Sequence, residues 1–358
     1  MIILSSLCIL PLAAQNFEKT KTSSETYYLS KDMAVKVQNK YGDIQIVNWE
    51  KDSVKITTNI EVRSNKQSKV DKIFNSIKMD FKHNHFYIIA KTEFLGQNGF
   101  WTDVSDISKT IFNSNTTTQV DYIVHIPNHV KLSIVNKYGD VYLGDYSGIL
   151  DIDVSNGDLN AHNLLGKSEI KISFGDLFVQ SLGRTKLEFS NVEAQVDDCD
   201  YMETKTRGSK LYINHVNELN ISSGHDKYYL DHVNKIYGNS KYSYLKIANL
   251  HSNADLIYKY GALHFKNLSD DIDHFYLETY KTEIHLNLIL ENAYVLNFKS
   301  IKSPDIRYPL EGFKKKETII DSILNLKNTQ LIWGDLITKK SIPFNIRAEE
   351  GNVFIKIN

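Results

Sequence analysis

The chain has very few cysteines and prolines for its length. Its 358 residues include two Cys and five Pro. Cys8 lies in an apolar N-terminal segment, so a chain that loses this segment keeps only Cys199 and cannot form an internal disulfide. Stability must therefore come from packing, and the length allows a sizeable core. The 21 Tyr and 16 Phe, with so little Pro, favour many strands joined by tight turns.

The chain also lacks an excess of either charge. Lys and Arg together number 42, and Asp and Glu together number 43. No global field would attract a polyanion such as nucleic acid, or the surface of an acidic membrane. We therefore expect no nucleic-acid partner.

Long apolar runs are absent as well. After residue 14 no stretch is long and apolar enough for a transmembrane helix. Residues 1–14, "MIILSSLCILPLAA", are too short to span a bilayer and end in small residues, which is typical of a signal peptide cleaved after Ala14. A buried N-terminal strand is the alternative. The signal peptide predicts an exported protein, located in the periplasm, on the outer-membrane surface or secreted. Leu7 before Cys8 disfavours lipidation.

A short pattern recurs through the middle of the chain. Two apolar residues alternate with a polar one, and a third apolar residue follows after two more polar positions. The seven copies are "DVYLGDY", "DLNAHNL", "DLFVQSL", "KLYINHV", "KYYLDHV", "YLKIANL" and "ALHFKNL". Their third apolar residues are Tyr146, Leu164, Leu182, Val216, Val233, Leu250 and Leu268, and the period places Cys199 in the same column. Steps of 17 or 18 residues indicate a repeat architecture.

A second alternating strand precedes each copy, as in "KLSIV", "LDIDV" and "EIKIS". Such a unit cannot bury its apolar face alone, but equivalent strands stacked about 4.8 Å apart would close a continuous core. We therefore predict an all-β protein, a parallel β-solenoid (β-helix) with rungs of 17 to 18 residues.

The strength of the period divides the chain after the signal peptide into three regions. These are an N-terminal β region at 15–130, the regular β-solenoid repeats at 131–290, and a less regular C-terminal β region at 291–358. We expect the last strand to close the C-terminal end of the sheet.

The N-terminal region departs from the strand pattern in two places. One short amphipathic helix is predicted near residues 65–78, begun by a Ser64/Gln67 capping box. It would cover the open end of the solenoid, which is otherwise prone to aggregate. Residues 94–118 are rich in Gly, Asn, Ser and Thr and predict a long surface loop.

The motif "NKYGD" stands at residues 39–43 and again at 136–140. We interpret it as a corner in which the Gly supplies a positive φ and the Asp bonds its own backbone. A phosphate-binding loop would need several glycines leading into a helix, and no helical pattern follows these turns. The motif therefore predicts a structural role.

The repeated "GD" corners resemble those of the bacterial putative-adhesin β-solenoid family of unknown function. The resemblance is clearest in residues 122–148, "YIVHIPNHVKLSIVNKYGDVYLGDYSG", and extends over roughly residues 25–358. That family is akin to the head GIN domains of putative autotransporter adhesins. The resemblance implies a solenoid fold and an adhesin-like function, and it supplies no catalytic residues.

Three carboxylates, Asp140, Asp158 and Asp176, occupy the same corner in successive repeats. Stacking would place them about 4.8 Å apart, where they could bind calcium or simply form turns. Calcium-binding β-roll repeats use denser Gly and Asp motifs, so we favour the turn-forming interpretation.

A second polar column contains Asp198, His215 and His232, which would be neighbours on successive rungs. Their spacing could hold a zinc ion, but third and fourth ligands are not obvious from the sequence. We favour an exposed polar ladder without a metal.

Cys199 falls in a column of Leu and Val, so it is expected to be a small buried apolar residue rather than a nucleophile. Tyrosines are concentrated in the later repeats. They could form a sugar-stacking face, although cross-strand stabilisation is the favoured interpretation, with about half of them pointing outward. The residues are Tyr228, Tyr229, Tyr237, Tyr242, Tyr244, Tyr258 and Tyr260.

The sequence contains no G-x-S-x-G elbow, H-E-x-x-H motif or dinucleotide fingerprint. We therefore assign no catalytic residue, no cofactor and no metal ligand. The sequence predicts an exported, non-catalytic, adhesin-like binding or scaffold protein of the bacterial cell envelope, with a glycan or an envelope protein as partner. One alternative is a polysaccharide lyase or glycoside hydrolase, which needs carboxylates with Arg or Lys in one cleft. The other is a structural protein that self-assembles through its end strands.

Overall fold

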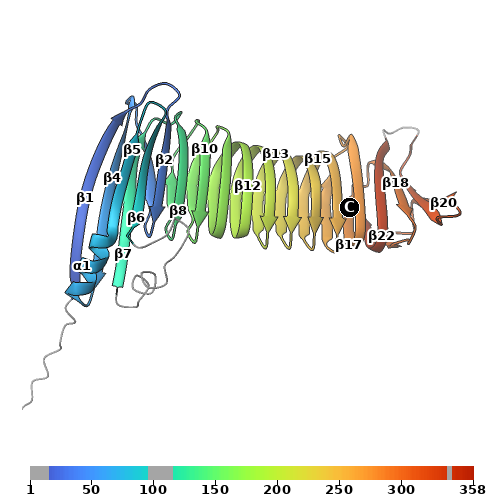
Figure 1. Cartoon of the computed structure of the whole chain (residues 1–358). Helices are drawn as coiled ribbons and strands as arrows, with labels where there is room; N and C mark the ends of the chain where they lie inside the picture. The colour runs from blue at the N-terminus through green and yellow to red at the C-terminus, as the bar shows by residue number, and fades with distance from the viewer. Residues whose placement is uncertain (1–15, 96–115, 337–340) are drawn as a thin grey trace, which may run out of the picture.

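The computed structural model, which describes residues 16–95, 116–336 and 341–358, is an elongated stack of β rungs (Figure 1). Each rung of the regular region contributes one strand before and one strand after a corner. The stack therefore has two faces that share one apolar interior. We call the face formed by the strands before the corner face A, and the face formed by the strands after it face B.

Neighbouring rungs from β8 to β16 pair in parallel with offsets of 17 or 18 residues, and β17 pairs in parallel with β15 and β16 at an offset of 21, which confirms the predicted solenoid. Leu150 lies opposite Ser168, Lys210 opposite Lys227, and Tyr244 opposite Ala262. The strands are β8 (Lys131–Lys137), β9 (Val141–Leu143), β10 (Leu150–Ser155), β11 (Leu159–Leu164), β12 (Ser168–Arg207), β13 (Lys210–Gly224), β14 (Lys227–Lys241), β15 (Tyr244–Lys259), β16 (Ala262–Leu268) and β17 (His274–Leu288).

The interior is a lengthwise column of side chains from the alternate positions of each strand. The third apolar residues of the repeats lie over one another, as predicted. Tyr146 forms a β-bridge with Leu164, and Cys199 and Val233 both lie opposite Val216. All of them are buried. Alternation places these side chains inside because successive residues of a strand point to opposite faces.

The N-terminal end begins with a rung formed by β2 (Ala34–Lys40) and β3 (Ile44–Asn48). These strands pair directly with β8 and β9, although the intervening chain makes four further strands and a helix. On face A, β6 (Tyr87–Phe94) pairs with β2, and β5 (Ile77–His83) is antiparallel to β6. On face B, β7 (Thr116–Ile126), β4 (Ser53–Ser64) and β1 (Phe17–Tyr28) follow β3 in that order.

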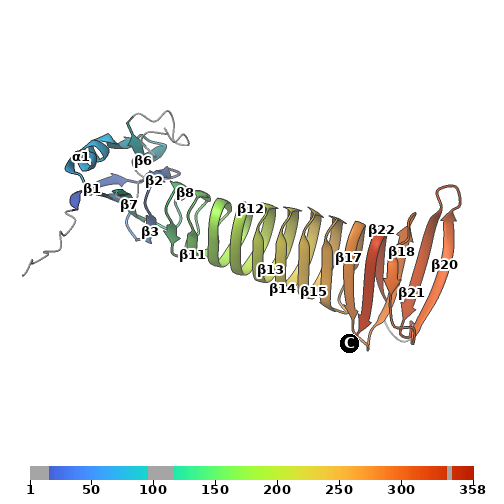
Figure 2. The ribbon, with the colours of Figure 1, turned by 90° about the horizontal axis from the view of Figure 1, so that it is seen from below.

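The single helix among the described residues is α1 (Gln67–Ser76), close to its predicted position. It buries Val70 and Ile73 against Val62 of β4 and lies at the N-terminal end of the stack (Figure 2). The predicted Ser64/Gln67 capping box is wrong. The N-cap residue is Lys66, which makes no side-chain cap hydrogen bond. Ser64 instead ends β4, and its hydroxyl shares a 3.0 Å hydrogen bond with a Thr hydroxyl of β7.

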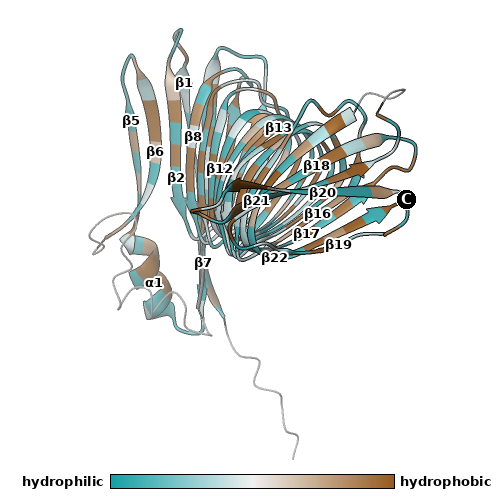
Figure 3. Cartoon of the chain, turned by 90° about the vertical axis from the view of Figure 1, so that its right-hand side faces the viewer, coloured by the Kyte–Doolittle hydropathy of each residue, from teal (hydrophilic) through white to brown (hydrophobic). Residues whose placement is uncertain are grey.

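The C-terminal end is also built out of sequence order. Its strands are β18 (Ala293–Ser300), β19 (Asp305–Arg307), β20 (Phe313–Asp321), β21 (Leu326–Trp333) and β22 (Ser341–Ile357). The last strand, β22, pairs in parallel with β17 on one side and with β18 and β19 on the other. The antiparallel hairpin of β20 and β21 lies beyond β18, at the end that faces the viewer in Figure 3. The expectation that the last strand closes the end is therefore wrong.

Two sequence predictions fall mainly on residues outside the described ranges. The signal peptide predicted at 1–14 lies wholly outside them. Of the loop predicted at 94–118, residue 94 ends β6 and residues 116–118 begin β7, so these flanks are strand rather than loop. The remainder, apart from residue 95, lies outside the described residues. Within the described part of the chain, no helix has the length and apolar character needed to cross a membrane.

Candidate functional site

The corners between faces A and B differ from the interpretation made from the sequence. At the corners that carry the "GD" motif, the positive φ belongs to the residue before the glycine, as at Tyr138 (61°) and Phe174 (59°). The glycine is needed because the corners stack closely. A Cβ atom on Gly139 would lie 2.0 Å from the carbonyl oxygen of Gly42, and one on Gly157 would lie 2.0 Å from that of Gly139. Such a contact is far inside van der Waals distance, so no larger residue fits.

The structure brings the predicted aspartate column together and extends it. The backbone N–H of Asp158 donates to Oδ1 of Asp140 at 2.9 Å, and that of Asp176 donates to Oδ1 of Asp158 at 2.8 Å. The sequence reasoning missed two earlier members. The N–H of Asp140 donates to Asp43, and the N–H of Asp43 donates to Asp121. The carboxylates of Asp121, Asp43, Asp140 and Asp158 thus bind the backbone of the next rung rather than their own, which corrects the sequence interpretation.

Stacking also affects the acidity of this aspartate ladder. Burial raises the pKa of the Asp43 carboxyl, and the neighbouring charges of Asp140 and Asp121 raise it further, against a backbone hydrogen bond that lowers it. Four of the five carboxylates already accept a hydrogen bond from a backbone N–H group through one oxygen. They are Asp121, Asp43, Asp140 and Asp158. These hydrogen bonds support the turn-forming role. Calcium binding is the alternative that the sequence disfavours, and these hydrogen bonds do not test it.

The predicted histidine pair forms a ladder on face B. The rings of His215 and His232 stack with centroids 4.9 Å apart, and Nδ1 of His215 lies 3.7 Å from Oδ1 of Asp198. A third ring, His251, stacks on His232, and nitrogen atoms of these two rings lie 3.1 Å apart. The sequence period did not place His251 here because the register between β14 and β15 shifts just after Val233.

Cys199 is buried, and its thiol donates to the carbonyl oxygen of Gly183 at 3.7 Å. Burial, assisted by the negative charge of Asp200, raises the pKa of the Cys199 thiol to about 12. The thiolate, which is the nucleophilic form, is therefore scarcely populated at neutral pH.

The tyrosines divide between the interior and the surface, as alternation predicts. Tyr228 and Tyr258 are fully buried, whereas Tyr242 and Tyr260 are exposed at successive corners. The exposed rings stack with centroids 5.0 Å apart, and His225 continues the stack on the other side of Tyr242. Tyr229, Tyr237 and Tyr244 are partly buried.

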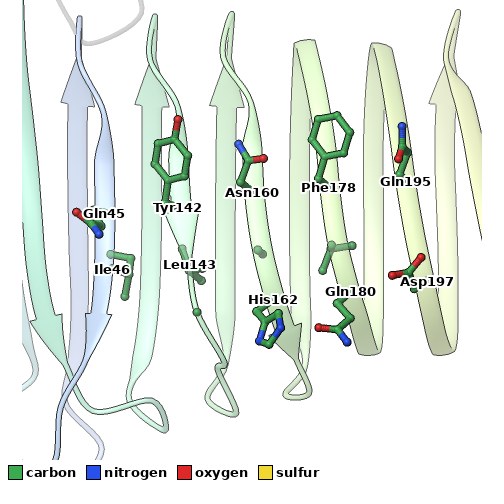
Figure 4. Close-up of a pocket in the computed structure, with 13 residues that line it drawn as sticks. Gln45, Ile46, Tyr142, Leu143, Asn160, His162, Phe178, Gln180, Gln195 and Asp197 are labelled. Atoms are coloured by element: carbon green, nitrogen blue, oxygen red, sulfur yellow. The ribbon is translucent and has the colours of Figure 1, made fainter.

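A shallow groove of about 560 Å³ crosses several rungs of face B (Figure 4). One wall is formed by the outward-pointing residue between the first two apolar residues of each repeat. The other wall is formed by the outward-pointing residue two positions later in each repeat. The first wall contains Tyr142, Asn160, Phe178 and Gln195, and the second contains His162, Gln180 and Asp197. Leu143, Ala161 and Val179 form the floor. Gln45 and Ile46 of β3 lie at the N-terminal end.

The two aromatic residues of the groove keep their ring surfaces accessible. Tyr142 is 40% exposed and Phe178 is 38% exposed. The Tyr142 hydroxyl donates to Oδ2 of Asp140 at 3.1 Å, which fixes the ring beside the aspartate ladder. Burial and this hydrogen bond raise the pKa of the Tyr142 phenol, so it remains neutral. The repeat pattern revealed this outward column, but the sequence reasoning considered only the later tyrosines as a stacking surface.

The opposite wall holds polar groups that are already oriented. Nδ1 of His162 lies 2.7 Å from Oδ1 of Asp145, and the Asn163 amide donates to the same oxygen at 2.7 Å. These two partners lower the pKa of the Asp145 carboxyl. The amide of Asn214 donates to Oδ1 of Asp197 at 2.8 Å. Asp197 is the one carboxylate among the described residues that line the groove.

No family model matches the chain, and the comparison with curated proteins gives no match. The solved structures similar to this one include a "putative cell adhesion protein" from Clostridium sporogenes ATCC 15579. It has 11% identity and a TM-score of 0.19, and the match covers 95% of this chain and 100% of that one. A "putative adhesin" from Bacteroides fragilis NCTC 9343 has 11% identity and a TM-score of 0.21, with 94% and 97% covered. Likenesses this remote do not bear on function.

Proposed function

We propose that the protein is an exported, non-catalytic, adhesin-like binding protein whose groove on face B holds an extended glycan. The observation that carries this proposal is the alternation of ring and amide along one wall, Tyr142, Asn160, Phe178 and Gln195. The C–H face of a sugar ring packs on an aromatic ring, while amides both donate to and accept from its hydroxyl groups.

The spacing of the wall fits a polymer that runs along the stack. Tyr142 and Phe178 are two rungs apart, which corresponds to about 10 Å. In an extended β-linked glycan, every second sugar presents the same face in the same direction. Two such sugars would therefore meet the two rings, and the sugar between them would meet Asn160.

The groove does not favour hydrolysis or elimination. Glycosidases use two carboxyl groups on either side of the scissile bond, and lyases need a base beside a cationic group. Asp197 is the single carboxylate among the described lining residues, and no Lys or Arg is among them. Export is supported by residues 1–14, whose sequence has the form of a signal peptide. The resemblance of the "GD" corners to the putative-adhesin family agrees with a surface role.

A panel of envelope polysaccharides tests the proposal by affinity electrophoresis, with each incubation also assayed for released sugars. We expect retardation by at least one neutral or acidic polysaccharide and no product. The double variant Tyr142→Ala/Phe178→Ala should weaken binding by about tenfold or more, because two stacking contacts are lost.

Phe174→Ala is the matched control, since Phe174 is also an exposed ring but lies at a corner and does not line the groove. If the double variant does not reduce retardation, or if Phe174→Ala reduces it equally, the glycan binds outside the groove. Release of any sugar product would support the polysaccharide lyase or glycoside hydrolase alternative instead.

A further inference from the structure

Three side chains with metal-binding atoms converge near the C-terminal end of face B. They are His264 on β16 and Glu283 and His285 on β17, and all three are partly buried. One potential ligand atom from each lies within 4.8 Å of the others. This group belongs neither to the groove nor to the histidine ladder predicted from the sequence.

The sheet itself produces the arrangement. His264 lies directly opposite His285 in the parallel pairing of β16 and β17. Glu283 precedes His285 by two residues, so both side chains leave the same face of the strand. The imidazole rings stack with centroids 4.1 Å apart, and Nε2 of His285 lies 2.5 Å from Oε1 of Glu283. Small rotations of these side chains would direct the three donors at one point.

The surroundings restrict the movement of the group. The ring of Tyr244 lies 5.0 Å from His264 on one side, and the ring of Phe354 lies 4.7 Å from His285 on the other. Aromatic rings therefore flank the group on both sides along the stack.

We propose that His264, Glu283 and His285 form a binding site for a divalent transition metal of the zinc class. Two imidazole nitrogens and one carboxylate oxygen are a donor set that zinc accepts at about 2.0–2.2 Å, whereas calcium and magnesium prefer oxygen alone. Three protein ligands leave at least one position open for water or an anionic group. The ion would join adjacent rungs across β16 and β17.

The histidine ladder of His215, His232 and His251 provides a comparison within the same face. Its rings are also stacked, with centroids 4.9 Å apart for His215 and His232. Its carboxylate, Asp198, lies 3.7 Å from His215 and is two rungs away from His232. Among the described residues, it is not a place where three donors converge. Substitution of His232 is therefore a matched control for loss of one stacked imidazole.

Isothermal titration of the untagged full chain with zinc chloride at neutral pH tests the site. We expect one equivalent to bind with measurable affinity, and His264→Gln and Glu283→Gln to weaken binding by more than tenfold each. Loss of an outer-shell partner alone costs roughly tenfold to a hundredfold, and these residues are direct ligands. His232→Gln should bind zinc as the parent does.

Cobalt(II) added to the same proteins gives a second readout, because a site with low coordination number has intense visible absorption. Circular dichroism in the absence of metal verifies that each variant is folded, and Glu283→Gln, which changes one partly exposed group, preserves the stack. Zinc binding that survives both ligand substitutions, or that is lost in His232→Gln, would overturn the proposal. The Tyr142→Ala/Phe178→Ala protein should keep its zinc site, so failure of the glycan proposal and failure of this one are separable.

Discussion

At the residue scale, the corners show how stacking restricts amino-acid choice. A non-glycine residue such as Tyr138 or Phe174 adopts the positive φ, which costs of order 1 kcal/mol or more and is tolerated because the rungs on both sides hold it. The following glycine is required for a different reason, which is the backbone of the neighbouring rung. The sequence showed where the corners fall, but the pattern of a single rung contains no information about what lies above it.

Gly139→Ala should strongly destabilise the protein, because its methyl group would lie 2.0 Å from a backbone oxygen that cannot move without shifting a rung. We expect the free energy of unfolding to fall by about 2 kcal/mol or more in chemical denaturation. Gly224→Ala is the control, since a Cβ atom there has no neighbour within 4 Å. Equal stability of the two variants would contradict the proposed reason for glycine at the corners.

At the scale of elements, the aspartate ladder ties successive corners through backbone hydrogen bonds. Asp158 both receives the N–H of Asp176 and donates its own N–H to Asp140. Asp158→Ala removes the first bond and should lower the free energy of unfolding by about 1 kcal/mol. Asp158→Asn keeps an oxygen acceptor and should lose less.

The same proteins test whether the ladder needs calcium. We expect the melting temperature of the parent protein to be equal in calcium chloride and in a chelator, because the hydrogen bonds alone satisfy the corners. A calcium-dependent rise in melting temperature that Asp158→Ala abolishes would restore the metal-binding interpretation.

Prediction from sequence succeeded for elements whose neighbours are adjacent repeats and failed where distant segments pair. The stacking of Leu164 on Leu182 follows from a constant period. Ser64 was assigned to a cap because its spacing to Gln67 fits a capping box, but β4 pairs with β7 and retains Ser64 in the sheet. The sequence period likewise did not bring together the three residues of the proposed zinc site. Glu283 and His285 stand after an irregular turn, so the period did not align them with His264.

At the scale of the whole molecule, the two ends determine whether copies join. Within the described residues, β1 pairs with β4 alone and β20 pairs with β21 alone, so each offers an open edge. Both edges carry charge: β1 has exposed Glu and Lys residues, and β20 has three consecutive exposed lysines. Charged side chains, and lysine above all, discourage edge-to-edge pairing.

We therefore expect a monomer in solution. Size-exclusion chromatography with light scattering should give a mass close to the 41.2 kDa of the chain, independent of concentration. Replacement of Lys314, Lys315 and Lys316 by Thr should promote association, because the edge of β20 loses its charge while its exposed isoleucines remain. Filaments formed by the parent protein would support the self-assembling alternative instead.

The position of β22 has a consequence for how the molecule is made. The residues of β22 follow β18, β20 and β21 in the chain, yet they lie between β17 and β18. Each earlier rung of the regular region can dock directly on its predecessor, whereas β17 and β18 each keep one unpaired edge until β22 inserts between them. Folding of this end therefore depends on contacts between distant segments, which form more slowly than contacts between successive rungs.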